Sequence, residues 1–163
     1  MKKLVVFYSM SGNTKEVALY VARKLRADII EIETVKEYPD DHDVLVSLGK
    51  KETETGYMPQ IRPLAIDFTK YDSIVIGTPI WWYTYAPAVG TFIKQFRQGL
   101  KGKAIYPFAT CGGSAGHANS DFKRALNKEK VEQLLPVKFE DSTMATPSAT
   151  LDEWAKAILK ATN

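Results

Sequence analysis

The sequence has few of the residues that build disulfides or metal clusters. Cys111 is its single cysteine, and His42 and His117 are its two histidines. One cysteine cannot form an internal disulfide, which agrees with a reducing compartment. His42 lies in an acidic run at residues 40–43, but one loose cluster without spaced partners is more typical of a solvated turn than of a cation site. We therefore expect no metal site.

Long hydrophobic runs and an excess of charge of one sign are also missing. The apolar run at residues 4–7 is too short for a signal-peptide core or a membrane span, and no small-residue cleavage site follows it. Lys and Arg total 22 against 19 Asp and Glu, and the lysines are scattered rather than gathered into arginine-rich blocks. We expect a cytoplasmic protein that binds neither membranes nor nucleic acid.

The apolar content is enough for one core. With 163 residues, 45% of them hydrophobic, residues 1–163 are expected to form a single domain. Short apolar stretches alternate with amphipathic helical patterns, which indicates an α/β fold with a mainly parallel sheet. Strands are expected at residues 3–9, 28–33, 72–78 and 104–110, with a weaker fifth at 137–139 beside Pro136. Their continuous apolar character predicts cover on both faces.

Apolar residues at helical spacing predict the helices. Val17, Val21 and Leu25 recur at steps of four and indicate a helix over residues 14–26. The same pattern predicts helices over residues 89–100, around 122–126 and over 151–158. The connection at residues 36–67 is polar and supports at best one short helix around residues 44–50. A connection of this length is usually functional or mobile, and it could cover part of a ligand site.

The first expected strand ends in a loop that suits a phosphate. Ligands of open α/β sheets bind at the carboxyl ends of the strands. This loop combines hydroxyl and amide groups, close backbone approach at a glycine, and the N–H groups of a helix start, without a lysine. It matches neither Gly-x-Gly-x-x-Gly nor a triphosphate loop, and the alternative is an N-cap in an ordinary turn. Its residues are Ser9, Met10, Ser11, Gly12, Asn13 and Thr14.

Two further strand ends suit a flat ligand. Four large aromatics within residues 81–85 are expected in a loop, where they would cover the face of a planar ligand or pack under the next helix. The loop after residue 110 is rich in small residues, which let the backbone lie against such a ligand or form a flexible connection. The residues concerned are Thr78, Pro79, Ile80, Trp81, Trp82 and Tyr83, then Thr110, Cys111, Gly112, Gly113 and Gly116.

These loops carry a resemblance to a known family. The loop at residues 9–14 resembles the phosphate loop of the flavodoxin family, and the Thr-Pro-Ile-Trp-Trp stretch at residues 78–82 is similar to one in its reductase branch. The resemblance spans almost the whole chain. It implies a flavodoxin-like three-layer sandwich, with a five-stranded parallel sheet in order 2-1-3-4-5 and helices on both faces. It also implies FMN at the switch point, with its phosphate on residues 9–14 and its ring system between residues 78–83 and the residues of the third loop.

Two departures from the carriers of this family bear on function. The chain is slightly basic, whereas electron-carrier flavodoxins tend to be strongly acidic, and the third loop lacks the tyrosine that often covers the outer flavin face. Both departures favour an oxidoreductase that reduces a small acceptor such as a quinone, using electrons from NAD(P)H or a partner protein. The alternatives are a non-enzymatic electron carrier and a flavin-dependent interaction module. Exposed aromatics at the flavin edge are compatible with a homodimer.

Two reactive residues need a separate interpretation. A phosphatase of similar topology would need Cys-x5-Arg, but His117 stands six residues after Cys111. Cys111 is therefore interpreted as a small buried thiol, with a thiolate role as the weaker alternative. His117 is expected to cap a helix or lie in solvent, with a position near the flavin as the alternative. We assign no catalytic side chain.

Overall fold

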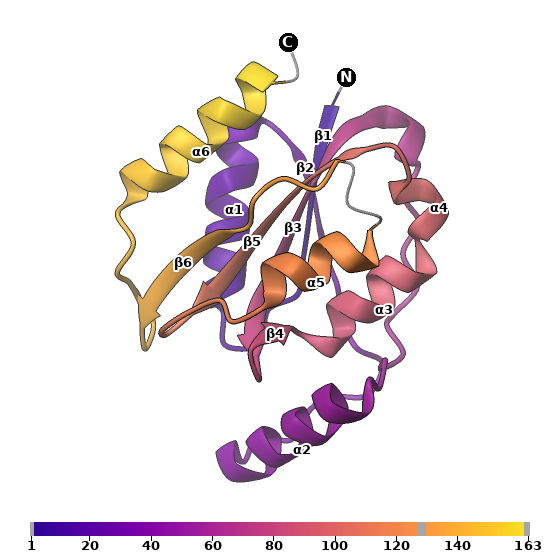
Figure 1. Cartoon of the computed structure of the whole chain (residues 1–163), viewed down its shortest axis with the longest axis vertical. Coiled ribbons are helices and arrows are strands. Elements are labelled where there is room, and N and C mark those ends of the chain that lie inside the picture. Colours follow the sequence, from indigo (N-terminus) through magenta and orange to yellow (C-terminus); the bar gives the residue numbers. More distant parts are fainter. Residues whose placement is uncertain (1, 127–129, 162–163) are drawn as a thin grey trace.

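The computed structural model describes residues 2–126 and 130–161 and shows an open, mostly parallel sheet between two layers of helices (Figure 1). Five strands run parallel in the spatial order β2-β1-β3-β5-β6. This is the strand order 2-1-3-4-5 that the resemblance implies, so the expected fold is confirmed. The strands are β1 (Lys2–Phe7), β2 (Asp28–Glu31), β3 (Tyr71–Trp81), β5 (Ala104–Cys111) and β6 (Leu135–Glu140).

Helices cover both faces of this sheet, as the apolar strands predict. One face packs against α1 (Asn13–Leu25) and α6 (Ser148–Ala161) in a core that contains Phe7, Val75 and Phe108. The other face packs against α3 (Pro87–Gln95), α4 (Arg97–Leu100) and α5 (Ala118–Ala125). Each buried side chain of this size contributes about 1.5–3 kcal/mol through its removal from water. The two cores hold the strand ends, and hence the loops that follow them, in fixed positions.

Two short strands extend the expected sheet. β4 (Thr84–Tyr85) pairs antiparallel with the end of β3, and β7 (Thr143–Met144) pairs antiparallel with β6. The aromatic segment at residues 81–85 was expected to be a loop, and this expectation is wrong except for Trp82 and Tyr83, because Trp81 ends β3 and Thr84 and Tyr85 form β4. Ile80 and Trp81 continue β3 because their backbone pairs with Tyr85 and Thr84. Pro136 lies inside β6, near its start, where a missing N–H is tolerated.

The helices agree with the sequence pattern except in two places. The helix expected over residues 89–100 is divided into α3 and α4 at Phe96, whose φ of −108° lies outside the helical range. The ring of Phe96 packs against Phe92 and Phe68, at 5.1 and 5.8 Å between ring centroids. The short helix expected around residues 44–50 is instead the 14-residue α2 (His42–Thr55), which Asp41 caps by accepting from the Val44 N–H.

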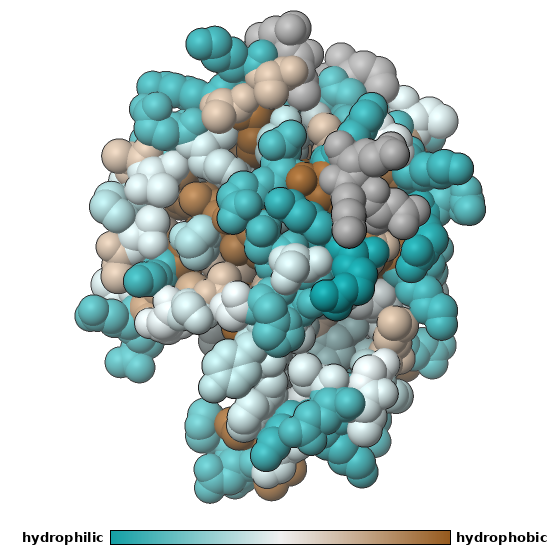
Figure 2. Space-filling view, in the orientation of Figure 1, coloured by the Kyte–Doolittle hydropathy of each residue, from teal (hydrophilic) through white to brown (hydrophobic). Residues whose placement is uncertain are grey.

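The connection that contains α2 leaves the body of the protein and returns to it. Its two ends pair, because the Val35 N–H donates to Gln60 and the Arg62 N–H donates to Glu33. Between these ends, α2 projects beyond the carboxyl ends of the strands, and Figure 2 shows a mixture of hydrophilic and hydrophobic residues over it. Among the described residues, no helix is long and apolar enough to cross a membrane.

Candidate functional site

The loop between β1 and α1 presents backbone N–H groups at the carboxyl edge of the sheet. Gly12 has a φ of +100°, in the left-handed region that glycine adopts readily. The Ser9 hydroxyl accepts from the N–H groups of Gly12 and Lys15, both at 3.2 Å, and so folds the loop back on itself. In the described part of the chain, the N–H groups of Ser11, Asn13 and Thr14 have no hydrogen-bond partner. These donors and the helix N-terminus behind them can hold an anion.

Neighbouring strand ends fix this loop in place. The hydroxyls of Thr14 and Thr110 share a hydrogen bond of 2.7 Å in the interior, which joins the start of α1 to the end of β5. The Asn13 amide donates to the backbone carbonyl of Asp141 at 2.8 Å, in the turn between β6 and β7. Lys15 is paired with Glu31 at 3.4 Å and lies outside this network. The loop is therefore rigid, and it holds its donors without a lysine.

The Thr14–Thr110 contact is testable by a double-mutant cycle. Thr14→Val leaves the buried Thr110 hydroxyl without a partner, so we expect a loss of about 1–2 kcal/mol in the free energy of unfolding. Thr110→Val should cost a similar amount for the same reason. The double variant should cost no more than one single variant, because no orphaned hydroxyl is left. Urea unfolding measures all four proteins, and strictly additive losses would contradict a shared hydrogen bond.

The aromatic segment forms a strained hairpin at the tip of β3. Trp82 and Tyr83 connect β3 to β4 as a two-residue turn, and both have positive φ, at 48° and 69°. Such turns favour asparagine and glycine, and each non-glycine residue in this region costs about 1–2 kcal/mol. Trp82 is 38% exposed and Tyr83 is 65% exposed. Strain of this kind gathers at functional sites, where the surrounding structure holds it in place.

The third loop packs directly against this hairpin. The His117 N–H donates to the Tyr83 carbonyl at 2.8 Å. Gly116 has a φ of +58°, and a Cβ at this position would lie 2.3 Å from the Tyr83 carbonyl oxygen. Gly113 has open space where a Cβ would be. The turn and the third loop thus touch at Gly116 and leave room over Gly113.

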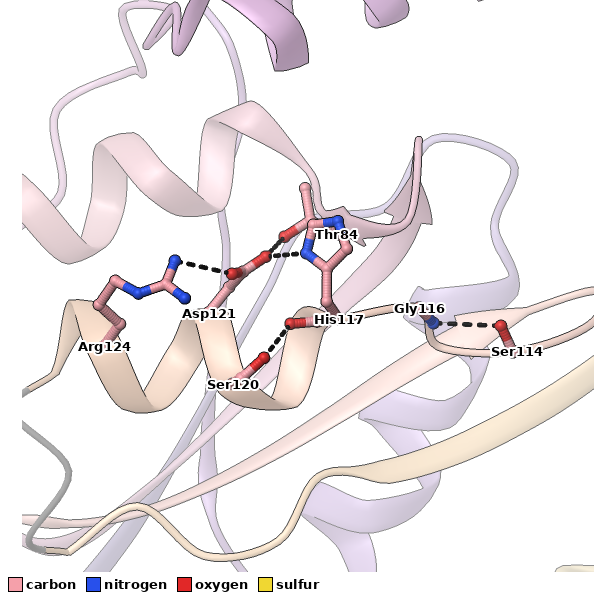
Figure 3. A network of polar contacts seen from close by, with 7 residues as sticks. All are labelled: Thr84, Ser114, Gly116, His117, Ser120, Asp121 and Arg124. Carbon is pink, nitrogen blue, oxygen red and sulfur yellow. Dashed lines mark hydrogen bonds and ion pairs between the residues drawn. The ribbon is translucent and has the colours of Figure 1, made fainter.

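A polar network on α5 holds the other side of the hairpin (Figure 3). The Asp121 carboxylate accepts from the Thr84 hydroxyl and from the Arg124 guanidinium, and it contacts His117 Nδ1. The Ser120 hydroxyl donates to the His117 carbonyl. His117 precedes α5, but its side chain makes no capping bond and is 61% exposed. It is therefore a surface partner of Asp121, which agrees with the expected exposure and not with side-chain capping.

α2 and the residues before it cover the inner side of the hairpin. The Trp81 ring meets the rings of Tyr38 and Tyr8 edge-on, with centroids 5.1 and 6.1 Å apart. The Trp82 indole N–H donates to the Val46 carbonyl at 3.2 Å, and Lys50 lies over the Trp82 ring. The connection that contains α2 therefore contacts both tryptophans of the hairpin. One of the two tryptophans packs inward, and the other lies at the surface.

The buried groups near this hairpin have shifted pKa values. Burial, with the nearby charge of Glu52, raises the pKa of Tyr8 to about 12. Burial also raises the pKa of Glu52, although the hydrogen bond from the Tyr38 hydroxyl opposes the shift by favouring the ionised form. Cys111 is 9% exposed, and burial raises the pKa of its thiol. Cys111 is therefore the buried thiol that the sequence suggests and not an activated nucleophile.

The shifted Glu52 should make stability depend on pH. Because its pKa is raised, the folded protein keeps this proton to a higher pH than the unfolded chain does. The stability that comes from protonated Glu52 is thus present at low pH and lost as pH rises above 4.5, the ordinary pKa of a glutamate. Glu52→Gln should therefore gain in free energy of unfolding relative to wild type as pH rises through this range. Urea unfolding at a series of pH values measures the difference, and exposed Glu54→Gln is the control.

The predicted site residues differ in burial: some are buried, some are exposed, and Ser9, Asn13, Pro79, Ile80 and Trp81 are intermediate. Thr14, Thr78 and Thr110 are buried. The Thr78 hydroxyl supports the hairpin because it accepts from the Ala86 N–H. The exposed residues come from three strand ends: Met10, Ser11 and Gly12, then Trp82 and Tyr83, then Gly112, Gly113 and Gly116. Sequence reasoning missed Tyr8, Tyr38, Glu52, Thr84, Asp121 and Asp141, all of which hold these loops. Tyr8, Thr84 and Asp141 could have been indicated by their places beside strand ends, whereas Tyr38, Glu52 and Asp121 have no such signal in the sequence. The described residues contain no group of metal ligands.

The strand order defines a doubly wound α/β protein, a fold in which ligands bind at the switch point, here between β1 and β3. The family model described as flavodoxin matches residues 2–157, and the chain therefore belongs to the flavodoxin family. Flavodoxins carry FMN at this switch point. The open N–H groups after β1 fit a phosphate, and the turn and the glycine loop fit the two sides of a flat ring. FMN is the cofactor of this protein.

Solved structures are similar over nearly the whole chain. A flavoprotein from Bacteroides eggerthii is 26% identical, with 97% of this chain and 98% of that chain covered and a TM-score of 0.80. A flavoprotein from Lactobacillus acidophilus, solved in complex with FMN, is 22% identical, with 94% and 98% covered and a TM-score of 0.76. Flavodoxin 1 from Bacillus cereus is 20% identical, with 98% of each chain covered and a TM-score of 0.58. No curated protein sequence matches the chain.

Proposed function

We propose that this protein is an FMN-dependent oxidoreductase that passes electrons from NAD(P)H or a partner protein to a small acceptor such as a quinone. Bound FMN supplies the redox chemistry, since it takes up and releases electrons one or two at a time. The observation that carries the proposal is the open space at Gly113, in the same loop that contacts the exposed aromatic turn through Gly116. An acceptor can approach there because no side chain of the third loop fills this space.

The chain's own residues bind and orient the cofactor. The N–H groups of Ser11, Asn13 and Thr14 hold the phosphate, and Ser9 keeps the loop folded. The residues of the turn, Pro79 to Tyr83, line one side of the ribityl chain and ring, while Gly112, Gly113 and Gly116 lie along the other. Trp81 and α2 exclude water from the inner side of the turn. No side chain is assigned a proton-transfer role.

FMN binding is tested with the purified protein and two flavins. The protein should be yellow as purified or take up added FMN. It should bind FMN about 100-fold more tightly than riboflavin, a difference of roughly 2.7 kcal/mol, because riboflavin lacks the phosphate that the loop holds. Fluorescence quenching of each flavin measures the two dissociation constants. Equal affinities would contradict the assignment of the phosphate loop.

The choice between enzyme and carrier is tested by kinetics. Oxidation of NADH and NADPH is followed with and without a quinone, using the FMN-loaded protein. Quinone-dependent oxidation supports the oxidoreductase. Failure with every acceptor, together with fast reduction by a reductase protein, would instead establish a non-enzymatic carrier. Size-exclusion chromatography with light scattering tests the homodimer, which the exposed Trp82 and Tyr83 favour.

A further inference from the structure

A pocket lies beside α2 and is lined in part by Tyr38, whose ring also contacts Trp81. Its volume is about 640 Å³, within the range of small-molecule sites. It is formed by one side of α2 and by the two segments that flank this helix, around residues 36–39 and 57–59. α2 projects from the body next to these segments (Figure 1). None of the residues assigned to the FMN site lines this pocket.

Half of the residues that line the pocket are apolar or carry a ring. Tyr38, Pro39, Tyr57 and Pro59 present rings to it, and Leu48 adds an aliphatic side chain. Tyr57 is 53% exposed, so one wall is open to solvent in the absence of a ligand. Flat ring walls of this kind match a planar, apolar ligand in shape and in the area that it buries.

The pocket has one polar anchor, the pair formed by Glu52 and Tyr38. Glu52 is 6% exposed, and its carboxylate accepts from the Tyr38 hydroxyl at 2.9 Å. In the described part of the chain, no lysine, arginine or histidine nitrogen lies within 4.0 Å of this carboxylate. A buried carboxylate without a cation is costly unless further donors satisfy its lone pairs.

The anchor determines the chemistry of a ligand. The single proton of the Tyr38 hydroxyl is used on Glu52, so both groups offer only acceptor lone pairs to the pocket. A ligand must therefore bring a hydrogen-bond donor. Lys36 and Lys51 line the pocket together with Glu37 and Glu52, so the lining charges balance and give no preference for a charged ligand. A neutral hydroxyl on a flat ring satisfies all of these conditions.

We propose that the pocket beside α2 binds a planar aromatic compound with a hydroxyl group, which lies between the tyrosine and proline rings and donates its O–H to Glu52. The site is next to the proposed flavin site, because Tyr38, which lines it, packs edge-on against Trp81. Binding here does not require the electron-transfer reaction proposed above.

The test compares 2-naphthol with 2-methoxynaphthalene on the FMN-loaded protein. The two probes have the same ring system, but only 2-naphthol has an O–H donor. Proton–nitrogen NMR spectra should show 2-naphthol shifting amides of residues 36–39 and 48–59. 2-Naphthol should bind about tenfold more tightly than the methoxy compound, because only 2-naphthol can donate a hydrogen bond to the Glu52 carboxylate. In Glu52→Gln most of this tenfold preference should be lost, and it should be unchanged in Glu54→Gln on the exposed side of the same helix.

Several outcomes would overturn the proposal. These are equal affinity of the two probes, an unchanged preference in Glu52→Gln, or absence of binding up to the solubility limit of 2-naphthol. Shifts confined to residues 78–83 and 110–116 would show the probe at the flavin site instead. The spectrum of each variant reports whether it is folded. Flavin affinity is measured separately, so a failure of this proposal is distinct from a failure of the proposed function.

Discussion

Replacing Gly116 with alanine should lower the free energy of unfolding by about 2–4 kcal/mol. A Cβ at this position would lie 2.3 Å from the Tyr83 oxygen and 2.6 Å from its Cα, and these are backbone atoms that cannot rotate away. The positive φ of Gly116 adds about 1–2 kcal/mol for a residue with a Cβ. The third loop must then move off the hairpin and break the bond from the His117 N–H to Tyr83. Urea unfolding followed by circular dichroism measures the loss.

Gly113→Ala is the matched control, three residues earlier in the same loop. A Cβ there meets nothing within 4 Å, and Gly113 is not among the residues with positive φ. Its stability should therefore stay within about 0.5 kcal/mol of wild type. Because the Gly116 variant separates the two sides of the proposed flavin site, its FMN affinity should also fall. A Gly116→Ala protein that unfolds at the wild-type urea concentration would refute the close contact.

The parallel sheet and the first loop were predictable from the sequence because local patterns decide them. Buried strands are continuous apolar runs, and α1 carries an apolar stripe that ends at Leu25, so both appear in any window of a few residues. The loop after β1 has the composition of a phosphate site because backbone N–H groups, one glycine and a helix start are enough to make one. These features need no knowledge of the rest of the chain.

The hairpin at Trp82 and Tyr83 was not predictable in the same way. A two-residue turn with positive φ at both positions normally contains asparagine or glycine, and neither is present here. Distant contacts hold it instead: His117 binds the Tyr83 carbonyl, Asp121 binds Thr84, and α2 binds Trp82. Each partner lies more than 30 residues away along the chain. Tertiary contacts therefore stabilise this turn conformation, although the local sequence disfavours it.

The length of α2 was underestimated for a related reason. Glu52 is a charged residue in a helix with a polar sequence. Only the folded structure shows that it is buried against Tyr38. In the sequence it is one of many charged residues in the connection, so nothing indicates that it is buried and lines a pocket. The pocket beside it follows from contacts between segments that flank the helix and not from any motif.

Replacing Gly77 with alanine should cost at least about 3 kcal/mol of unfolding free energy. Gly77 lies in β3 directly beside Phe108 of β5, and a Cβ would be 2.2 Å from the Phe108 ring. Phe108 is 0% exposed, and its ring already meets Trp154 edge-on on the α6 side. The ring has no free space to enter, so the strain falls on the centre of the sheet. Urea unfolding measures this loss as well.

Gly99→Ala provides a comparison with a similar overlap but a smaller expected loss. A Cβ at Gly99 would lie 2.3 Å from the Phe68 ring, but Phe68 is only partly buried and can turn toward solvent. Gly99 is also in a helix, where alanine gains about 1 kcal/mol over glycine. At the contact between β3 and β5, Phe108→Leu should relieve part of the Gly77→Ala loss, so the double variant should lose less than the sum of the two single variants. If the losses in free energy of unfolding from Gly77→Ala and Phe108→Leu were additive, the Phe108 ring would not be the cause of the strain at residue 77.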